Sequence, residues 1–166
     1  MRVVVVRHGI AVDRDDPDCP PDPDRYLTDE GRQRTRRAMR GLKRLDVRPE
    51  VVCVSPWRRA VETAEICVDV LGLDPESVER REDLLPGADP RSLAEHVRGL
   101  GAECVLVVGH APHVDRLLAE LLGLGDVFMS SLKKSAAASI VLEGDRSGPT
   151  LEWLMPPRAL RRLARS

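Results

Sequence analysis

The feature of this 166-residue sequence that most constrains its fold is a set of short apolar runs, rich in β-branched residues, each followed directly by loop residues. Three runs cover residues 2–6, 51–54 and 104–108, and two later ones cover residues 136–142 and 150–154. Continuous apolar runs of this length are typical of strands buried on both faces, as in parallel sheets covered by helices. The sequence therefore predicts a sheet whose central strands are parallel and enclosed.

Amphipathic segments lie between the runs and are predicted to be helices. They cover residues 28–45, 55–71, 89–100 and 112–122. Thr28 is the expected N-cap of the first helix, and Ser55-Pro56 is the expected start of the second, which ends before Gly72. This alternation predicts an α/β fold, a three-layer sandwich with a mainly parallel central sheet of about six strands and helices on both faces.

Two segments depart from the alternation. Residues 13–24 hold six aspartates and four prolines, which exclude a helix or a central strand and predict a solvated loop rather than a metal site. Residues 156–166 carry four arginines and follow a single predicted domain over residues 1–155. We expect them to form a basic tail, as a short surface helix or a frayed end.

Composition narrows the class of protein. Hydrophobic residues make up 42% and charged residues 32% of the chain, which excludes a wholly disordered protein. The apolar runs are far shorter than the roughly 18 residues of a membrane span, and the start of the chain does not fit a secretory signal. A net charge of −1 provides no general attraction for nucleic acid, and the four cysteines form no Cys-x-x-Cys pair. We expect a cytoplasmic protein without membrane or nucleic-acid partners.

Reactive and anion-binding residue types follow three of the predicted strands. They are Arg7-His8-Gly9 after the first run, Arg59 after the second and Gly109-His110 after the third. In open α/β sheets, ligands bind outside the carboxyl ends of the strands, so two histidines and two arginines are expected to converge there. Guanidinium groups pair bidentately with phosphate oxygens, and an imidazole between them stays neutral and nucleophilic. The glycines, Gly9 in particular, are expected to offer unhindered amide donors to the ligand.

These motifs resemble those of the histidine phosphatase superfamily, to which phosphoglycerate mutases and acid phosphatases belong. The resemblance rests on Arg7-His8-Gly9, Ser55-Pro56-x-x-Arg59-Ala60-x-x-Thr63, Gly109-His110 and Leu27-Thr28-x-x-Gly31-x-x-x-Thr35. The short chain and the small residues at 135–139 resemble most closely the compact SixA-type phosphohistidine phosphatases. The resemblance implies a phosphatase that works through a phosphohistidine enzyme intermediate.

The resemblance also implies roles for individual residues. His8 would be the nucleophile, and Arg7 and Arg59 would bind the phosphoryl oxygens. His110 would donate to the same oxygens and stabilise the transition state. In the compact group an arginine just before the Leu-Thr turn also reaches the phosphate, and Arg25 has that place.

The family uses a carboxylic acid to protonate the leaving group, after a short strand in the middle of the chain. The matching stretch here contains Asp83, with Glu82 as the alternative one residue earlier.

The sequence offers no clear metal site, and no role is expected for the histidines and lysines outside the motifs. His110 and His113 have a His-x-x-His spacing, but Pro112 interrupts it and no carboxylate or cysteine cluster completes a zinc set, so neither a metal nor a cofactor is expected. His113 is expected at the rim of the site or exposed, and His96 at the surface. Lys133-Lys134 is expected to be a solvated turn.

Three functions are compatible with these residues. The first is dephosphorylation of phosphohistidine on a protein such as a phosphotransfer domain, which the short segment between His8 and Thr28 favours because it leaves no room for a lid. The second is hydrolysis of a small phosphoester such as a sugar phosphate, a nucleotide or a cofactor precursor. The third is an inactive phosphate-binding adaptor, against which the intact His8 counts.

Overall fold

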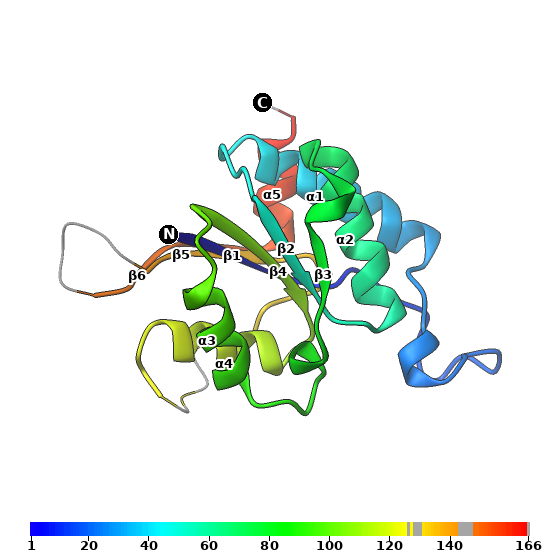
Figure 1. Ribbon diagram of the computed structural model, residues 1–166. Helices are drawn as coiled ribbons and strands as arrows, with labels where there is room; N and C mark the ends of the chain where they lie inside the picture. The colour runs from blue at the N-terminus through cyan, green and yellow to red at the C-terminus, as the bar shows by residue number, and fades with distance from the viewer. Residues whose placement is uncertain (126, 128–130, 143–147, 166) are drawn as a thin grey trace.

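The computed structural model describes residues 1–125, 127, 131–142 and 148–165. Six strands form one sheet in the order β3-β2-β4-β1-β5-β6 (Figure 1). They are β1 (Arg2–Arg7), β2 (Val51–Val54), β3 (Val78–Arg80), β4 (Cys104–Gly109), β5 (Ala137–Val141) and β6 (Thr150–Met155). The first four are mutually parallel where they pair, whereas β5 pairs antiparallel with both β1 and β6. The mainly parallel sheet that the sequence predicts is confirmed.

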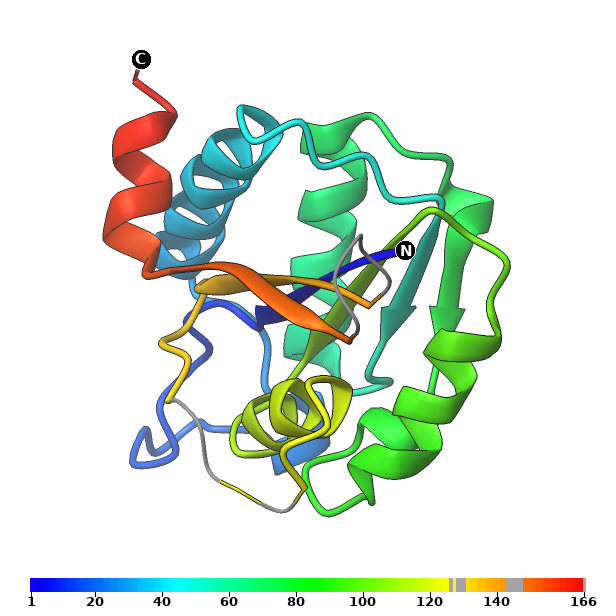
Figure 2. The same cartoon turned by 90° about the vertical axis from the view of Figure 1, so that its left-hand side faces the viewer.

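Helices cover both faces of this sheet (Figure 2). The α-helices are α1 (Asp29–Lys43), α2 (Arg58–Leu71), α3 (Pro90–Gly99), α4 (His113–Leu121) and α5 (Pro157–Leu163), and short 3-10 helices are η1 (Asp22–Asp24), η2 (Pro75–Ser77) and η3 (Glu82–Leu84). Helices α1, α2 and α5 pack on one face, and α3 and α4 pack on the other. Among the described residues, no helix combines the length and the apolar character that crossing a bilayer requires.

Strand β1 contributes side chains to both layers of the core. Its side chains alternate, so that Val4 and Val6 pack against the layer of α1 and α2, while Val3 and Val5 pack against that of α3 and α4. All four valines are fully buried. This burial on both faces explains why the strand is a continuous apolar run rather than an alternating one.

One helix starts as the sequence predicts, and another starts later. Thr28 caps α1 by accepting a hydrogen bond from the Gly31 amide at 3.0 Å, as predicted. The predicted start of α2 at Ser55-Pro56 is wrong, because α2 begins only at Arg58. The Ser55 amide instead donates to the Val108 carbonyl of β4 at 3.1 Å, which prolongs the strand pairing and turns the hydroxyl toward the end of the sheet.

The two segments that depart from the alternation, residues 13–24 and 156–166, differ in structure. Residues 13–24 form a loop with only the short η1 in it, as expected. Within the basic tail, Pro157–Leu163 form α5. Ser166 lies outside the described residues. Leu160 of α5 is fully buried against α1, where a Cβ on Gly41 would lie 1.8 Å from the Leu160 carbonyl oxygen. Only a glycine permits this close approach of the two helices.

Candidate active site

The sheet order brings the three predicted motifs to one edge. Strand β4 lies between β1 and β2, so the residues that follow these strands meet at their carboxyl ends. A pocket of about 500 Å³ opens there, which we call the arginine pocket. It is lined by Arg7, His8, Asp13, Arg14, Asp15, Asp22, Arg25, Arg59, Pro86, His110, Ala111 and Lys134. Of the predicted site residues, only Gly9 and Asp83 do not line it.

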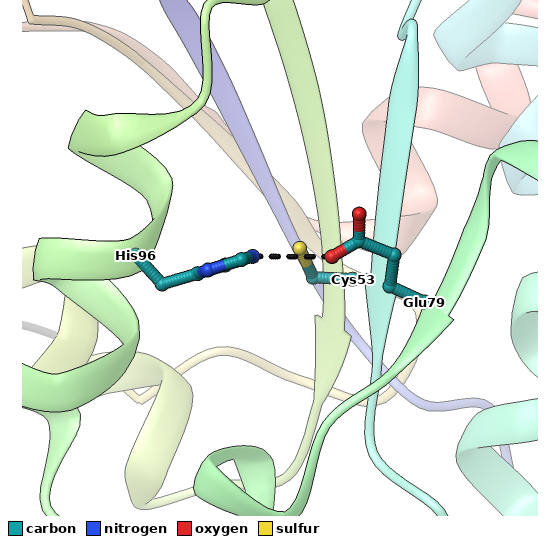
Figure 3. Close-up of side chains that lie close together, drawn as sticks. All are labelled: Cys53, Glu79 and His96. Atoms are coloured by element: carbon teal, nitrogen blue, oxygen red, sulfur yellow. Dashed lines mark hydrogen bonds and ion pairs between the residues drawn. The ribbon is translucent and has the colours of Figure 1, made fainter.

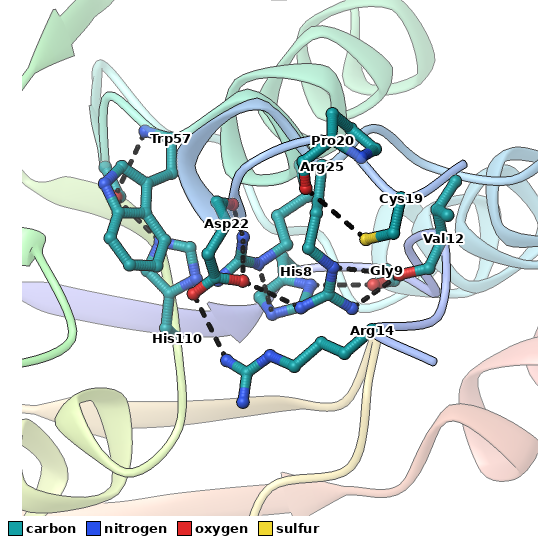
Figure 4. Close-up of polar contacts among 12 residues, drawn as sticks. His8, Gly9, Val12, Arg14, Cys19, Pro20, Asp22, Arg25, Trp57 and His110 are labelled. Carbon is teal, nitrogen blue, oxygen red and sulfur yellow. Dashed lines mark hydrogen bonds and ion pairs between the residues drawn. The ribbon is translucent and has the colours of Figure 1, made fainter. Parts of the chain in front are cut away.

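His8 is held in one tautomer and orientation (Figure 4). Its Nδ1 lies 2.7 Å from the Gly9 carbonyl oxygen, which can only accept, so Nδ1 carries the proton and Nε2 carries a lone pair. The Nε of Arg59 donates to that lone pair at 3.2 Å. Burial lowers the pKa of His8 to about 3, and the charges of Arg59 and Arg7 act in the same direction. The neutral imidazole that the sequence predicts is therefore present, with Nε2 facing the arginines.

His110 completes the floor of the pocket beside His8. The centroids of the two rings are 5.0 Å apart, and the His110 Nε2 lies 2.8 Å from the Ser55 hydroxyl. Burial lowers the pKa of His110 to about 2, with His8 and Arg59 contributing. Its Nδ1 is buried without a hydrogen-bond partner among the described groups. When Nε2 accepts from Ser55, Nδ1 can donate to a ligand oxygen.

A carboxylate that the sequence analysis missed lies among the guanidiniums. Asp22 pairs with Arg25 at 2.8 Å, with Arg14 at 3.2 Å and with Arg59 at 3.4 Å, and its carbonyl also accepts from Arg59 Nη1 at 2.6 Å (Figure 4). Burial raises the pKa of Asp22, but the hydrogen bond from Arg25 and the charges of Arg59 and Arg14 outweigh it and lower the pKa overall. Asp22 is therefore an anion held where an anionic ligand is expected. The spacing Asp22-x-x-Arg25 is the only local signal for it.

The other two predicted phosphate ligands have partners within the protein. Arg25 donates from Nε and Nη2 to the Val12 carbonyl at 2.9 and 2.6 Å. Arg7 donates from Nη1 to the Leu132 carbonyl at 2.6 Å, while its buried Nε has no hydrogen-bond partner among the described groups. These backbone contacts fix both guanidiniums at the wall of the pocket.

Gly9 has a different role from the one predicted. The expectation of an unhindered amide is wrong, because the Gly9 amide donates to Thr63 Oγ1 at 3.0 Å. A Cβ at this position would lie 2.3 Å from Thr35 Oγ1, so the glycine is required for packing between β1 and α1. Its carbonyl, rather than its amide, serves the site by orienting His8.

The predicted general acid lies outside the arginine pocket. The carboxylate of Asp83 accepts two hydrogen bonds from Arg81, at 3.2 and 2.7 Å, and Glu82 is exposed. The nearby His113, expected at the rim of the site or exposed, is instead buried and does not line the pocket, and this burial lowers its pKa. The carboxylates that do line the pocket are the paired Asp22 and the exposed Asp13 and Asp15.

Three side chains of types that bind metals, none of which lines the arginine pocket, meet between the sheet and α3 (Figure 3). Cys53 of β2, Glu79 of β3 and His96 of α3 have ligand-type atoms within 4.8 Å of one another, and we call them the cysteine trio. His96 was expected at the surface, but it is partly buried and its Nε2 lies 3.1 Å from the Glu79 carboxylate. Burial raises the pKa of the Cys53 thiol to about 12, and Glu79 adds to this shift. The thiol is thus kept protonated.

Known proteins resemble this chain in sequence and in fold. Residues 3–85 match the histidine phosphatase superfamily (branch 1). The chain is 36% identical over 160 residues to the phosphohistidine phosphatase SixA of Escherichia coli (strain K12), an alignment that covers 95% of this chain and 94% of the relative. The solved structure of the protein histidine phosphatase SixA complexed with tungstate has a TM-score of 0.81 and 34% identity, covering 96% of this chain and 99% of that one.

A more distant structure shares the fold alone. A mycobacterial glucosyl-3-phosphoglycerate phosphatase has a TM-score of 0.69 at 18% identity, covering 91% of this chain and 96% of that one. The likeness to SixA, in contrast, extends over nearly the whole length of both chains. With His8, Arg59 and His110 meeting at the carboxyl ends of the strands, this chain belongs to the histidine phosphatase superfamily and is a SixA-like phosphatase.

Proposed function

We propose that this phosphatase removes the phosphoryl group from phosphohistidine on another protein. The E. coli relative is named a phosphohistidine phosphatase, and the SixA structure holds tungstate, which is a tetrahedral oxyanion like phosphate. In this chain the arginine pocket offers cationic groups to such an oxyanion and a neutral imidazole to its central atom.

The proposed reaction has two displacements at phosphorus. In the first, the His8 Nε2 lone pair forms a bond to phosphorus while the bond from phosphorus to the substrate imidazole breaks, and the departing imidazole takes a proton from water. In the second, a water oxygen attacks the phosphorus of phospho-His8, which releases inorganic phosphate and restores the imidazole. Arg7, Arg25 and Arg59 neutralise the phosphoryl oxygens, and His110 Nδ1 donates a hydrogen bond to one of them.

Asp22 must leave this set of contacts for the phosphoryl group to bind. Its carboxylate occupies hydrogen-bonding positions on Arg25 and Arg59 that the substrate oxygens would take. We infer that the substrate displaces the Asp22 side chain, which is about one-third exposed and can turn toward solvent.

The proposal of phosphohistidine as the substrate rests on how the carboxylates around the pocket are paired. Asp22 is held as an anion by three arginines, and Asp83 is paired with Arg81 outside the pocket. An alkoxide leaving group depends on a proton donor, whereas imidazole has an unperturbed pKa of about 6.5 and can be protonated by solvent. Among the described residues no buried, unpaired carboxylic acid lines the pocket, and this arrangement favours phosphohistidine over alkyl phosphoesters.

The experiment that tests this proposal compares leaving groups on the wild-type enzyme. We expect kcat/KM to be higher for a phosphohistidine peptide than for any sugar phosphate, with p-nitrophenyl phosphate between them because nitrophenolate is a weak base. A higher kcat/KM for a sugar phosphate, a nucleotide or another small phosphoester would instead support the small-molecule phosphomonoesterase.

A further inference from the structure

A second cavity of about 400 Å³ adjoins the arginine pocket. Arg7 and Lys134 line both cavities, so the two are neighbours. Beyond them the cavity is lined by Arg34 of α1, Lys133 of the loop before β5 and Arg161 of α5. We call this cavity the basic groove. The side-by-side packing of α1 and α5 brings its outer wall together from distant parts of the sequence (Figure 2).

The basic groove concentrates positive charge on a chain that is nearly neutral. None of its lining residues is acidic, although the whole chain has a net charge of −1. Among the described residues, no carboxylate lies within ion-pair distance of Lys133 or Arg161, and Arg34 has only the exposed Glu30, at 2.5 Å. Exposed pairs of this kind contribute little, so Arg34 remains available to a ligand.

The cations of the groove also repel one another. Burial lowers the pKa of Arg161, and the charges of Arg34, Arg37 and Arg158 lower it further. Burial likewise lowers the pKa of Lys134, with Arg7 and Arg25 contributing. Like charges gathered with few counter-charges destabilise the free protein, and the binding of an anion relieves their repulsion.

The arginine pocket itself carries both signs of charge. Asp13 and Asp15 of the loop at residues 13–24 line it, and the charge of Asp13 acts on Lys134 to raise its pKa. The groove beyond Lys134 has no acidic lining residue, so a negatively charged segment beside the phosphoryl group meets complementary charge there.

We propose that the basic groove is the docking site for an acidic segment of the phosphorylated protein substrate, next to its phosphohistidine. The inference rests on the proposed function, since it supplies the contacts that a protein substrate makes beyond the phosphoryl group. Lys133, Arg34 and Arg161 lie outside the arginine pocket, so they select the substrate without touching the reacting atoms.

The test uses two phosphohistidine peptides of equal length, one flanked by aspartate and glutamate and the other by serine and glycine. We expect the wild-type kcat/KM to be about tenfold higher for the acidic peptide and this preference to shrink when the ionic strength rises from about 0.05 M to about 0.5 M. The double variant Lys133→Glu/Arg161→Glu should lose the preference, and Arg161→Gln alone should lose part of it. Turnover of p-nitrophenyl phosphate should stay within about twofold in all of them, which also shows that they are folded.

Arg162→Glu is the matched control. Arg162 is exposed on the same helix, one residue along, and does not line the groove. The acidic-peptide preference should survive in this variant, because its change in net charge leaves the groove intact.

The possible failures are distinct. Equal kcat/KM for the two peptides, or an equal loss in Arg162→Glu, would overturn the docking site while leaving the phosphohistidine activity standing. No hydrolysis of either peptide, with small phosphoesters still hydrolysed, would overturn the proposed function itself. A preference for a bisphosphate over a monophosphate that the double variant loses would assign the groove to a second phosphate group, and would overturn the protein-docking inference.

Discussion

The arginine pocket and the cysteine trio each gather residue types that carry chemistry, yet they differ in position and charge. His8 follows the last residue of β1, where its imidazole meets Arg59 and the pocket. Cys53 lies within β2, where its thiol points into the core and burial raises its pKa to about 12. Both residues are buried in their neutral forms, but only His8 presents a lone pair to a cation, the guanidinium of Arg59. Placement at a strand end, rather than residue type, separates the reactive group from the inert one.

Removal of the nucleophile should have the largest effect on activity. His8→Ala should reduce kcat by more than about 10⁴-fold, because no other group in the pocket can form the phosphoenzyme. Rapid quenching of the wild type with labelled substrate should place an acid-labile phosphate on His8. A label on any other residue, or a His8→Ala variant with normal turnover, would contradict the two-step mechanism.

The next largest effect is expected at Arg59. Arg59→Ala should lower kcat/KM by about 10²–10³-fold, since one donor to the transition-state oxygens is lost together with the contact to His8 Nε2. Arg58→Ala is the matched control, because Arg58 is exposed and pairs with Glu62. Losses of equal size in the two variants would show that Arg59 contributes no more than general positive charge.

The depressed pKa of His8 should also make the stability of the protein depend on pH. The pKa of His8 is about 3 in the folded chain and about 6.5 in an unfolded one, so between these values the unfolded state binds more protons. Stability is therefore lost as the pH falls from 7 to 5, by about 2 kcal/mol for His8 alone. Urea unfolding at both pH values should show a smaller loss in His8→Gln than in the wild type. An identical loss in His8→Gln would contradict the depressed pKa.

A smaller effect is expected at Asp83, the residue on which sequence and structure differ most. Because its carboxylate is paired with Arg81, Asp83→Asn should change kcat/KM for the phosphohistidine peptide and for p-nitrophenyl phosphate by less than about threefold. A severe loss confined to alkyl phosphates would show that Asp83 turns into the pocket and acts as the general acid predicted from the sequence. The same loss in Glu82→Gln instead would move that role by one residue.

The smallest effect is expected in the cysteine trio. Cys53→Ala and His96→Gln should leave kcat/KM within about twofold of the wild type. EDTA should not alter turnover, because arginines and histidines of the pocket bind and attack the phosphoryl group. Loss of activity in EDTA that zinc restores in the wild type but not in Cys53→Ala would make the trio a functional metal site.

Much of the fold could be read from local patterns. The run at residues 104–108 predicts β4, and Thr28 marks the start of α1, because burial and capping depend on neighbours within a few residues. The start of α2 could not be read in this way. Ser55 resembles a helix cap, but its amide donates to the Val108 carbonyl of another strand and its hydroxyl lies beside His110 Nε2. Local sequence does not reveal these partners, because they come from distant parts of the chain.

The apolar runs and the residues that follow them predict the parallel sheet, and they predict that His8, Arg59 and His110 converge once those strands are neighbours. Which strands are neighbours, with β4 between β1 and β2, is a property of the tertiary structure. The same holds for Asp22 among the arginines, for Asp83 outside the pocket and for the groove that Arg161 of the last helix forms with Lys133. These placements depend on contacts between residues far apart in the chain, and packing rather than local sequence selects the partners.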